Sequence, residues 1–190
     1  MRAASEQISK LELPLMPLHL IIDGYNLIRQ SADLKALDRQ ALEFGRDALI
    51  EKLVAYRRIK RHKITLVFDG SAKYFFPGAE TSWKGVNIKF SRHGESADSV
   101  IREMARQERE KAIVVSSDTE VSDFAASQGA VAIPSGEFEE KLLMTEMMEA
   151  GDFGEESGTV SKRVTGTKKK GPARKLPKNR RRIRQKTKKL

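Results

Sequence analysis

The stretch LHLIIDGYNLI, residues 18–28, decides how this sequence folds. Its first five residues are apolar except for one histidine, which is typical of a strand buried on both faces of a parallel sheet. The strand ends on Asp23, Gly24 follows directly, and Asn26 comes shortly after. A carboxylate at the end of a buried strand serves either as the N-cap of a helix or as part of an active site. The rest of the sequence shows how much weight the second interpretation has.

The length and composition of the chain limit its fold and function. With 190 residues, of which 39% are hydrophobic, the chain can form one domain with an extension but not two full domains. The absence of cysteine excludes disulfides, thiolate metal sites and cysteine nucleophiles, and it favours a cytoplasmic location. No apolar run approaches the roughly 18 residues of a membrane-spanning helix, so we expect no membrane span.

The net charge of +10 conceals two oppositely charged parts. Of the 36 lysine and arginine residues, 15 lie at 162–190, where there is no aspartate or glutamate. Residues 1–161 hold the other 21 basic residues and all 26 acidic ones. The sequence therefore predicts a mildly acidic body followed by a strongly basic tail.

Apolar runs alternate with helical patterns through the body of the chain. We expect a leader at 1–17, one domain at 18–150, a linker at 151–161 and a disordered basic tail at 162–190. The predicted strands are 18–22, 63–68, 86–90, 112–116 and 130–133, the predicted helices are 39–61, 96–110, 119–128 and 136–150, and 71–85 is predicted to be a loop. This alternation is typical of an α/β fold with a mostly parallel central sheet, on which ligands bind at the carboxyl ends of the strands.

Carboxylates follow several of the predicted strands. Asp23, Asp69 and Asp118 each end a strand, and Glu95 and Asp98 stand at the start of the helix that follows another. The carboxyl ends of parallel strands lie at one edge of a sheet, and the helices that follow begin at that same edge. Four separate segments are therefore predicted to bring acidic side chains to one place.

Each of these residues alone is more often structural than functional, because aspartate is a good N-cap and turn former. Their combination favours a site, since clustered carboxylates repel one another unless a cation lies among them. Hard ions such as Mg²⁺ and Mn²⁺ prefer such oxygen ligands, and they support phosphoryl chemistry. Asn26 could orient a phosphate or a water, or it could form a local turn, and the two roles are compatible.

Four segments, IIDGYNLI, VFDG, GESADSVI and VVSSDTEVSDFA, follow one another in this order. Together they resemble the NYN domain, a branch of the PIN-like nuclease fold, and in particular the YacP-like group of bacterial ribonucleases. The resemblance covers 18–149 and implies a three-layer α/β/α sandwich and a Mg²⁺- or Mn²⁺-dependent endoribonuclease. By position it implies that Asp23, Asp98 and Asp118 are catalytic and hold the metal, and that Asn26, Asp69 and Glu95 assist. The segment ESAD, with Ser96, stands where the family has a sequence like ETAD.

Other polar and aromatic residues near these motifs have two interpretations. Ser116 and Ser117 could contact phosphate or cap the next helix, and Asp123 is either a further ligand or, as we prefer, part of a solvated helix face. Tyr25 could stack on a base or simply pack, and His93 is interpreted as a surface residue. The aromatics at 74–76 and Trp83 could stack on single-stranded bases, although burial against the sheet is the commoner fate.

The segment 162–190 is rich in lysine, arginine, glycine and proline, and it has too few apolar residues to fold alone. Such a segment binds polyanions in a salt-dependent manner. Nucleic acid is a better candidate than an anionic membrane, because no amphipathic anchor or lipidation signal accompanies the charges; a merely solubilising role is the third possibility. The residues expected to contact RNA are Lys168, Lys169, Lys170, Arg174, Lys175, Arg180, Arg181, Arg182 and Arg184.

The sequence thus supports a metal-dependent endoribonuclease that hydrolyses RNA phosphodiester bonds and whose basic tail tethers RNA, a ribosome or another ribonucleoprotein. The main alternative is a non-catalytic RNA- or ribosome-binding protein with the same fold, although clustered carboxylates bring no benefit to such a protein. A DNA nuclease of the flap-endonuclease type is a third hypothesis, and a metal-dependent phosphatase is a distant fourth.

Overall fold

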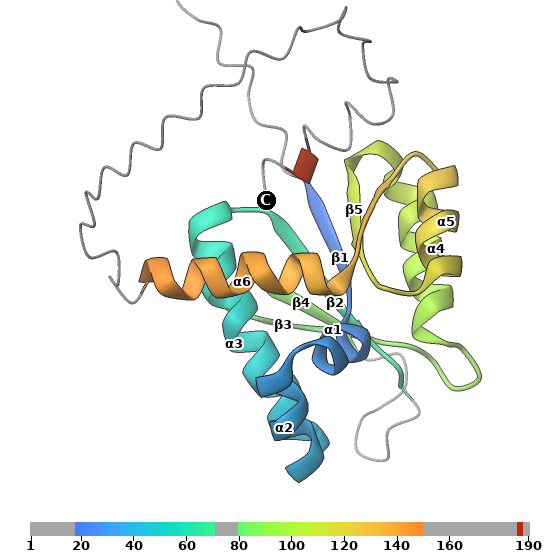
Figure 1. The fold of residues 1–190 in the computed structure, drawn as a ribbon. Helices are drawn as coiled ribbons and strands as arrows, with labels where there is room; N and C mark the ends of the chain where they lie inside the picture. The colour runs from blue at the N-terminus through green and yellow to red at the C-terminus, as the bar shows by residue number, and fades with distance from the viewer. Residues whose placement is uncertain (1–17, 71–79, 150–185, 188–190) are drawn as a thin grey trace, which may run out of the picture.

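A computed structural model describes residues 18–70, 80–149 and 186–187 of the chain (Figure 1). Their centre is a six-stranded sheet in the order β3-β4-β2-β1-β5-β6. All neighbouring strands are parallel except β3 and β4, which are antiparallel. The strands are β1 (His19–Asp23), β2 (Lys63–Phe68), β3 (Glu80–Trp83), β4 (Val86–Phe90), β5 (Ala112–Val115) and β6 (Val131–Ile133). The predicted mostly parallel α/β sheet is confirmed.

Helices cover both faces of this sheet, as Figure 1 shows. One layer contains α1 (Gly24–Gln30), α2 (Ala32–Gln40), α3 (Leu42–Lys60) and α6 (Ser135–Glu149), and the other contains α4 (Ala97–Glu108) and α5 (Thr119–Ser127). A 3-10 turn, Arg109–Lys111, leads from α4 into β5. The predicted three-layer α/β/α sandwich is therefore confirmed for the part of the chain that the structure describes.

The alternation of side chains along β1 explains the two layers. Leu20 and Ile22 belong to the larger apolar core, under α1, α2, α3 and α6, whereas Ile21 belongs to a second core under α4 and α5. Successive side chains of a strand point to opposite faces, so a strand covered on both sides must be apolar at every position. All five residues of β1 are buried for this reason.

The predicted elements are all present, with bounds that differ by a few residues. Two helices were not predicted: Asp23 caps α1 directly after β1, and Ser31 caps α2. The helix predicted over 39–61 begins only at Leu42, because the backbone of Ala41 is extended and separates α2 from α3. The predicted leader and linker, and the nine basic residues expected to contact RNA, lie outside the described residues.

The prediction of a loop over 71–85 is wrong for its last part. Residues Glu80–Trp83 form the edge strand β3, which pairs with β4. Lys84 and Gly85 make the connection, and both have positive φ values, 45° and 86°. Two such residues form the tight hairpin turn that suits the twist of antiparallel strands. Residues 71–79, including the aromatics at 74–76, lie outside the described residues.

Gly70 fixes how β2 ends beside β4. Its backbone N–H donates to the Ser91 hydroxyl at 2.9 Å, and Ser91 N–H donates to the Phe68 carbonyl at 2.9 Å. A Cβ at residue 70 would lie only 2.0 Å from the Ser91 carbonyl oxygen. The glycine therefore permits the close approach that aligns the two strand ends.

A buried histidine lies at the opposite, amino end of the central strand. His19 Nδ1 donates to Glu108 Oε1 at 3.1 Å, and Nε2 lies 2.8 Å from the Thr65 hydroxyl. Lys63 Nζ lies 3.7 Å from the same carboxylate oxygen. Burial lowers the pKa of His19, although the hydrogen bond to Glu108 opposes this shift. The folded protein therefore favours the neutral imidazole.

This shift predicts a stability change in mildly acidic solution. A histidine whose pKa is lowered by folding contributes stability above its unfolded pKa of 6.5, and this contribution is lost as pH falls from there to the folded pKa. Urea unfolding at pH 7.5 and 5.5 should show the advantage of wild type over His19→Gln shrinking by up to about 1.4 kcal/mol per pH unit below 6.5. The exposed His93→Gln is the matched control, and an equal change in both variants would contradict the prediction.

Candidate active site at the carboxyl edge of the sheet

Asp23 ends the central strand and is only 8% exposed. Its Oδ1 accepts the backbone N–H of Asn26 at 3.0 Å, so the carboxylate is the N-cap of α1. Its Oδ2 accepts a hydrogen bond from the Ser116 hydroxyl at 3.4 Å. The two interpretations of this residue are therefore compatible, since one carboxylate caps a helix and also lies at the edge where ligands bind.

Ser116 connects Asp23 to the next acidic residue. The same hydroxyl that donates to Asp23 accepts the backbone N–H of Asp118 at 3.1 Å. Asp118 in turn caps α5, because its Oδ1 accepts the N–H of Val121 at 3.1 Å. Ser116 thus sets the relative position of two carboxylates on neighbouring strands. The expected helix cap is provided by Asp118 and not by Ser116, which instead joins the two carboxylates.

Asn26 holds three segments together with one oxygen atom. Its Oδ1 accepts the backbone N–H of Ser117 at 3.0 Å and the hydroxyl of Ser135 at 2.8 Å. Ser135 begins α6, and its own N–H donates to the Ser117 hydroxyl at 3.1 Å. A backbone N–H can only donate, so the amide oxygen must face Ser117 and the amide nitrogen is the free end. Within the described residues, Asn26 Nδ2 makes no hydrogen bond and remains available as a donor.

Asp98 lies in the first turn of α4, and Ser96 is the N-cap of this helix. Its charge acts on Asp23, and the charges of Asp118 and Asp69 act on it. The structure therefore brings these four carboxylates, from four different segments, within electrostatic range of one another. That arrangement is the one predicted from the strand ends.

Burial raises the pKa of Asp23 above its usual range, the hydrogen bond from Asn26 opposes this, and the charge of Asp98 raises it further. Burial also raises the pKa of Asp98, followed by the charge of Asp118, while Arg102 opposes the shift. In both residues the charged form is less stable than it is in water. A nearby cation would remove this penalty.

Glu95 makes its hydrogen bonds within its own turn, and Asp123 is exposed to solvent. Glu95 Oε2 accepts the backbone N–H of Arg92 at 3.1 Å, and its own N–H donates to the Arg92 carbonyl at 3.0 Å. It therefore closes the turn before α4, and its assisting role stays a prediction. Asp123 is exposed on α5, as expected for a solvated helix face. Tyr25 packs edge-on against Phe68, with ring centroids 5.0 Å apart.

In residues 18–70, 80–149 and 186–187, no group of three or more histidine, cysteine or acidic side chains is arranged to hold a metal ion. A fully formed metal site made by Asp23, Asp98 and Asp118 alone therefore stays a prediction. The chemistry of the donors nevertheless fits a hard divalent ion. All of them are carboxylate oxygens, and the carboxyl groups of Asp23 and Asp98 have raised pKa values. Mg²⁺ commonly takes one or two protein carboxylates and completes its shell with water and phosphate oxygens.

Ser135 is the functional-site residue that sequence reasoning missed. It is fully buried, yet it lies 109 residues from Asn26 in the chain. A serine after a proline at a helix start is a common sequence feature, so nothing local marks it.

In the described part of the chain, no helix is long and apolar enough to cross a membrane.

The chain matches the family model of the YacP-like NYN domain over residues 20–187. The YacP protein of Bacillus subtilis strain 168 is 31% identical over 87 residues, which are 46% of this chain and 51% of YacP. The aligned stretch therefore spans about half the length of that relative. The family match extends past the 18–149 of the initial resemblance and includes most of the basic segment.

Two solved structures share the fold. The crystal structure of Rae1 (YacP) from Bacillus subtilis has a TM-score of 0.59 and 27% identity, and covers 72% of this chain and 79% of that one. A mutant of the same protein has a TM-score of 0.59 and 25% identity, and covers 70% and 80% of the two chains. Both matches cover more than two thirds of each chain and support the α/β fold described above.

The hydrogen bonds of Asn26 predict a structural role that can be measured separately from activity. Asn26→Ala leaves the Ser117 N–H and the buried Ser135 hydroxyl without their acceptor, so the free energy of unfolding should fall by roughly 1–3 kcal/mol. Chemical denaturation measures this change. Gln30→Ala, an exposed position at the end of the same helix, is the control and should change stability little. Equal stability of Asn26→Ala and wild type would contradict the proposed connection.

Proposed function

Because the chain belongs to the YacP-like NYN domain family, which is part of a nuclease-like superfamily, we propose that it is a metal-dependent endoribonuclease. The single observation that carries the proposal is the meeting of Asp23, Asp69, Asp98 and Asp118 at the carboxyl edge of one parallel sheet. A protein gains no stability from bringing negative charges together. The arrangement has a use if it binds a cation that acts on a phosphate group.

We assign Asp23, Asp98 and Asp118 to holding Mg²⁺ or Mn²⁺, with Asp69 and Glu95 assisting. When bound, such an ion lowers the pKa of water and offsets negative charge on the phosphate oxygens that react. The protein supplies the positions of the ligands. Asp23 is fixed by α1 and Ser116, and Asp118 by α5 and Ser116, so neither carboxylate needs to reorganise far to accept a ligand.

Asn26 contributes a neutral donor beside these charges. Its oxygen is engaged by Ser117 and Ser135, which fixes the plane of the amide and the direction of Nδ2. An amide N–H can donate to a phosphate oxygen without adding charge to an acidic site. We therefore propose that Asn26 orients the phosphate that is cleaved.

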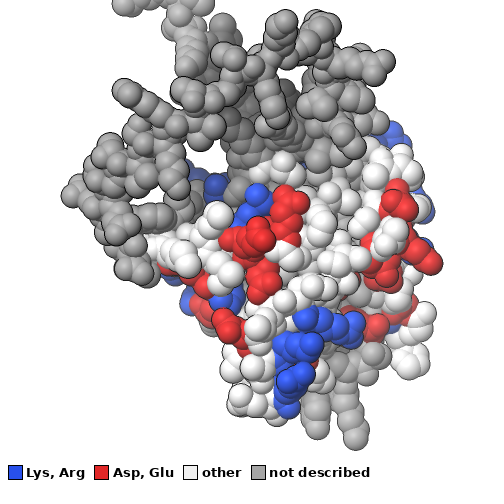
Figure 2. Space-filling model, in the orientation of Figure 1, with Lys and Arg blue, Asp and Glu red and all other residues white. Residues whose placement is uncertain are grey.

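The basic segment compensates for the charge of the body. On the face drawn in Figure 2, acidic and basic side chains lie in separate small groups and form no continuous basic surface. We propose that the nine basic residues named in the sequence analysis, Lys168, Lys169, Lys170, Arg174, Lys175, Arg180, Arg181, Arg182 and Arg184, hold RNA, or a ribosome or another ribonucleoprotein, near the site in the cytoplasm. Tethering raises the effective concentration of the substrate without any new contact in the site.

The first test is Asp98→Asn, which removes one charge and keeps the shape of the side chain. Cleavage of single-stranded RNA in Mn²⁺ should fall at least roughly 100-fold, since the ion supplies several kcal/mol of charge stabilisation. Wild type should show no cleavage in EDTA. Mn²⁺ should also raise the Tm of wild type more than that of the variant, because an ion that binds only the folded protein stabilises it.

Asp123→Asn is the matched control, because Asp123 is an exposed carboxylate one helical turn after Asp118 and should be dispensable. Undiminished cleavage by Asp98→Asn would refute the site. RNA binding with no metal and no cleavage by any variant would instead support the non-catalytic alternative. Cleavage of DNA in preference to RNA of the same sequence would support the DNA nuclease hypothesis.

The second test concerns the basic segment. Replacing these nine basic residues by glutamine, with Lys178 kept, is preferable to truncation, because Lys186 donates to the backbone carbonyl of Glu110 in the body. If each residue neutralises one phosphate, the slope of log affinity against log salt should become flatter by roughly 6. Fluorescence anisotropy with labelled single-stranded RNA measures both quantities. An unchanged slope would show that the segment does not contact RNA.

A further inference from the structure

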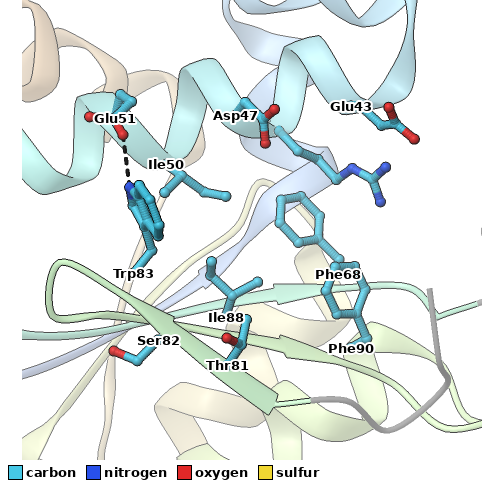
Figure 3. A pocket seen from close by; sticks show the side chains of 11 residues that line it. Glu43, Asp47, Ile50, Glu51, Phe68, Thr81, Ser82, Trp83, Ile88 and Phe90 are labelled. Atoms are coloured by element: carbon cyan, nitrogen blue, oxygen red, sulfur yellow. Dashed lines mark hydrogen bonds between the residues drawn. The ribbon is translucent and has the colours of Figure 1, made fainter. Parts of the chain in front are cut away.

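A cavity of about 580 Å³ lies between helix α3 and the β3–β4 edge of the sheet (Figure 3). Its apolar part is formed by Phe68, Ile88 and Phe90 from the sheet and Ile50 from the helix. Trp83 stands at one end, and its side chain is 51% exposed although it is the largest in the protein. The half-exposed indole of Trp83 thus adds a flat aromatic surface to one end of the apolar cavity.

The Trp83 ring is held in place. Its Nε1 donates to Glu51 Oε1 at 2.8 Å, and Lys84 Nζ lies 3.3 Å from both oxygens of the same carboxylate. The Lys84 ammonium is also 5.3 Å from the centre of the indole ring. The indole N–H is therefore satisfied and the ring has a fixed orientation, which suits it to stack against a flat partner.

Acidic side chains line the helical side of the cavity. Glu43, Asp47 and Glu51 follow one another at intervals of four residues on α3 (Figure 3), and the basic residue Arg46, whose guanidinium lies 6.0 Å from the centre of the Phe90 ring, lines the same side. Glu51 is engaged by Trp83 and Lys84. Glu43 and Asp47 make no hydrogen bond or ion pair with any other residue that the structure describes. The cavity thus combines apolar walls with unused hydrogen-bond acceptors at its rim.

A nucleobase has the complementary chemistry. Its flat faces stack on aromatic rings, and its edge carries N–H donors that a carboxylate accepts. Three of the four charged residues that line the cavity are acidic, so the cavity favours a base over a phosphate. Adenine and cytosine present an exocyclic amino group, whereas uracil presents a single ring N–H. We propose that this cavity binds an unpaired base of the RNA substrate and prefers bases that carry an amino group.

One end of the cavity, at Phe68, lies beside the candidate active site. Phe68 directly precedes Asp69, and a Cβ at Gly24, the residue after Asp23, would lie 2.2 Å from the Phe68 ring. Along α3, Glu43 lies nearest the carboxyl edge, and Glu51 is two helical turns away, roughly 12 Å. A base stacked on Trp83 would therefore lie beside the amino end of β4, opposite Val86, with the length of the cavity between it and the carboxyl edge. The inference rests on the proposed function, since it assigns the base specificity of the same nuclease.

Trp83 is the only tryptophan of the chain, so its fluorescence reports on this cavity directly. The experiment uses full-length Asp98→Asn protein, which keeps the RNA intact, and the trinucleotides of adenosine, cytidine and uridine as probes. Excitation near the red edge of the indole band avoids absorption by the bases. We expect saturable quenching, with several-fold tighter binding of the adenosine and cytidine trinucleotides than of the uridine one.

Two variants test the assigned contacts. Asp47→Asn should lower the preference for adenosine over uridine roughly threefold to tenfold, because the carboxylate that accepts the amino group is gone. Glu140→Gln, an exposed acidic residue on α6, is the control for the change in net charge and should leave the preference unaltered. Trp83→Leu, followed with labelled RNA, should bind about tenfold more weakly, as expected for the loss of one stacked base.

Equal affinity for all three trinucleotides in wild type and in Asp47→Asn would overturn the proposal. So would quenching by an arginine-rich peptide but by no trinucleotide, because a basic peptide would then be the occupant. A cavity filled by residues 71–79 of the chain itself would give no quenching with any probe, which also overturns it. These readouts do not depend on cleavage, so they can fail while the Asp98 test succeeds, or succeed while that test fails.

Discussion

Asp23 places a negative charge at the end of a strand that is covered on both faces, and much of the surrounding structure serves to keep that charge there. Removing a carboxylate from water is unfavourable unless hydrogen bonds or a cation replace the solvent. The N–H of Asn26 and the hydroxyl of Ser116 provide part of this replacement. They do not provide all of it, since the pKa of Asp23 stays raised. The charged form of Asp23 is therefore still less stable than in water, and a cation at this edge would stabilise it.

The hydrogen bonds of this edge also join segments that are distant in sequence. Asp23 and Asn26 come from the first strand and helix, Ser116 and Ser117 from the end of β5, and Ser135 from the start of α6. Each contact uses a short polar side chain next to the end of a buried strand. The position of one carboxylate relative to another is therefore set by the register of β1 and β5, which is fixed by their apolar residues. The same packing that stabilises the fold orients the site.

Sequence reasoning found what depends on periodicity and on the ends of strands. The apolar run of β1 and the stripe of α4 identified their elements, and topology alone placed Asp23, Asp98 and Asp118 at one edge. It did not find α1 and α2, because the turn-like DGYN hides a helix whose cap is the strand's own last residue. It missed β3, whose four residues are all exposed and carry no apolar alternation. Ser135 could not be found, since its partner is distant in sequence and no local pattern marks it.

Charge explains why such a site needs more than the described body of the chain. An acidic edge attracts cations and repels the phosphates on which it would act, and the rim of the cavity beside α3 is acidic as well. In the proposed function, the positive charge that lets RNA approach this edge comes from a bound ion and from the basic segment. The acidic groups at the edge then disfavour the phosphate backbone wherever no cation lies between them and the phosphate. The proposed base site is consistent with that constraint, because the cavity offers aromatic walls for stacking and two free carboxylates, those of Glu43 and Asp47, to the edge of a base.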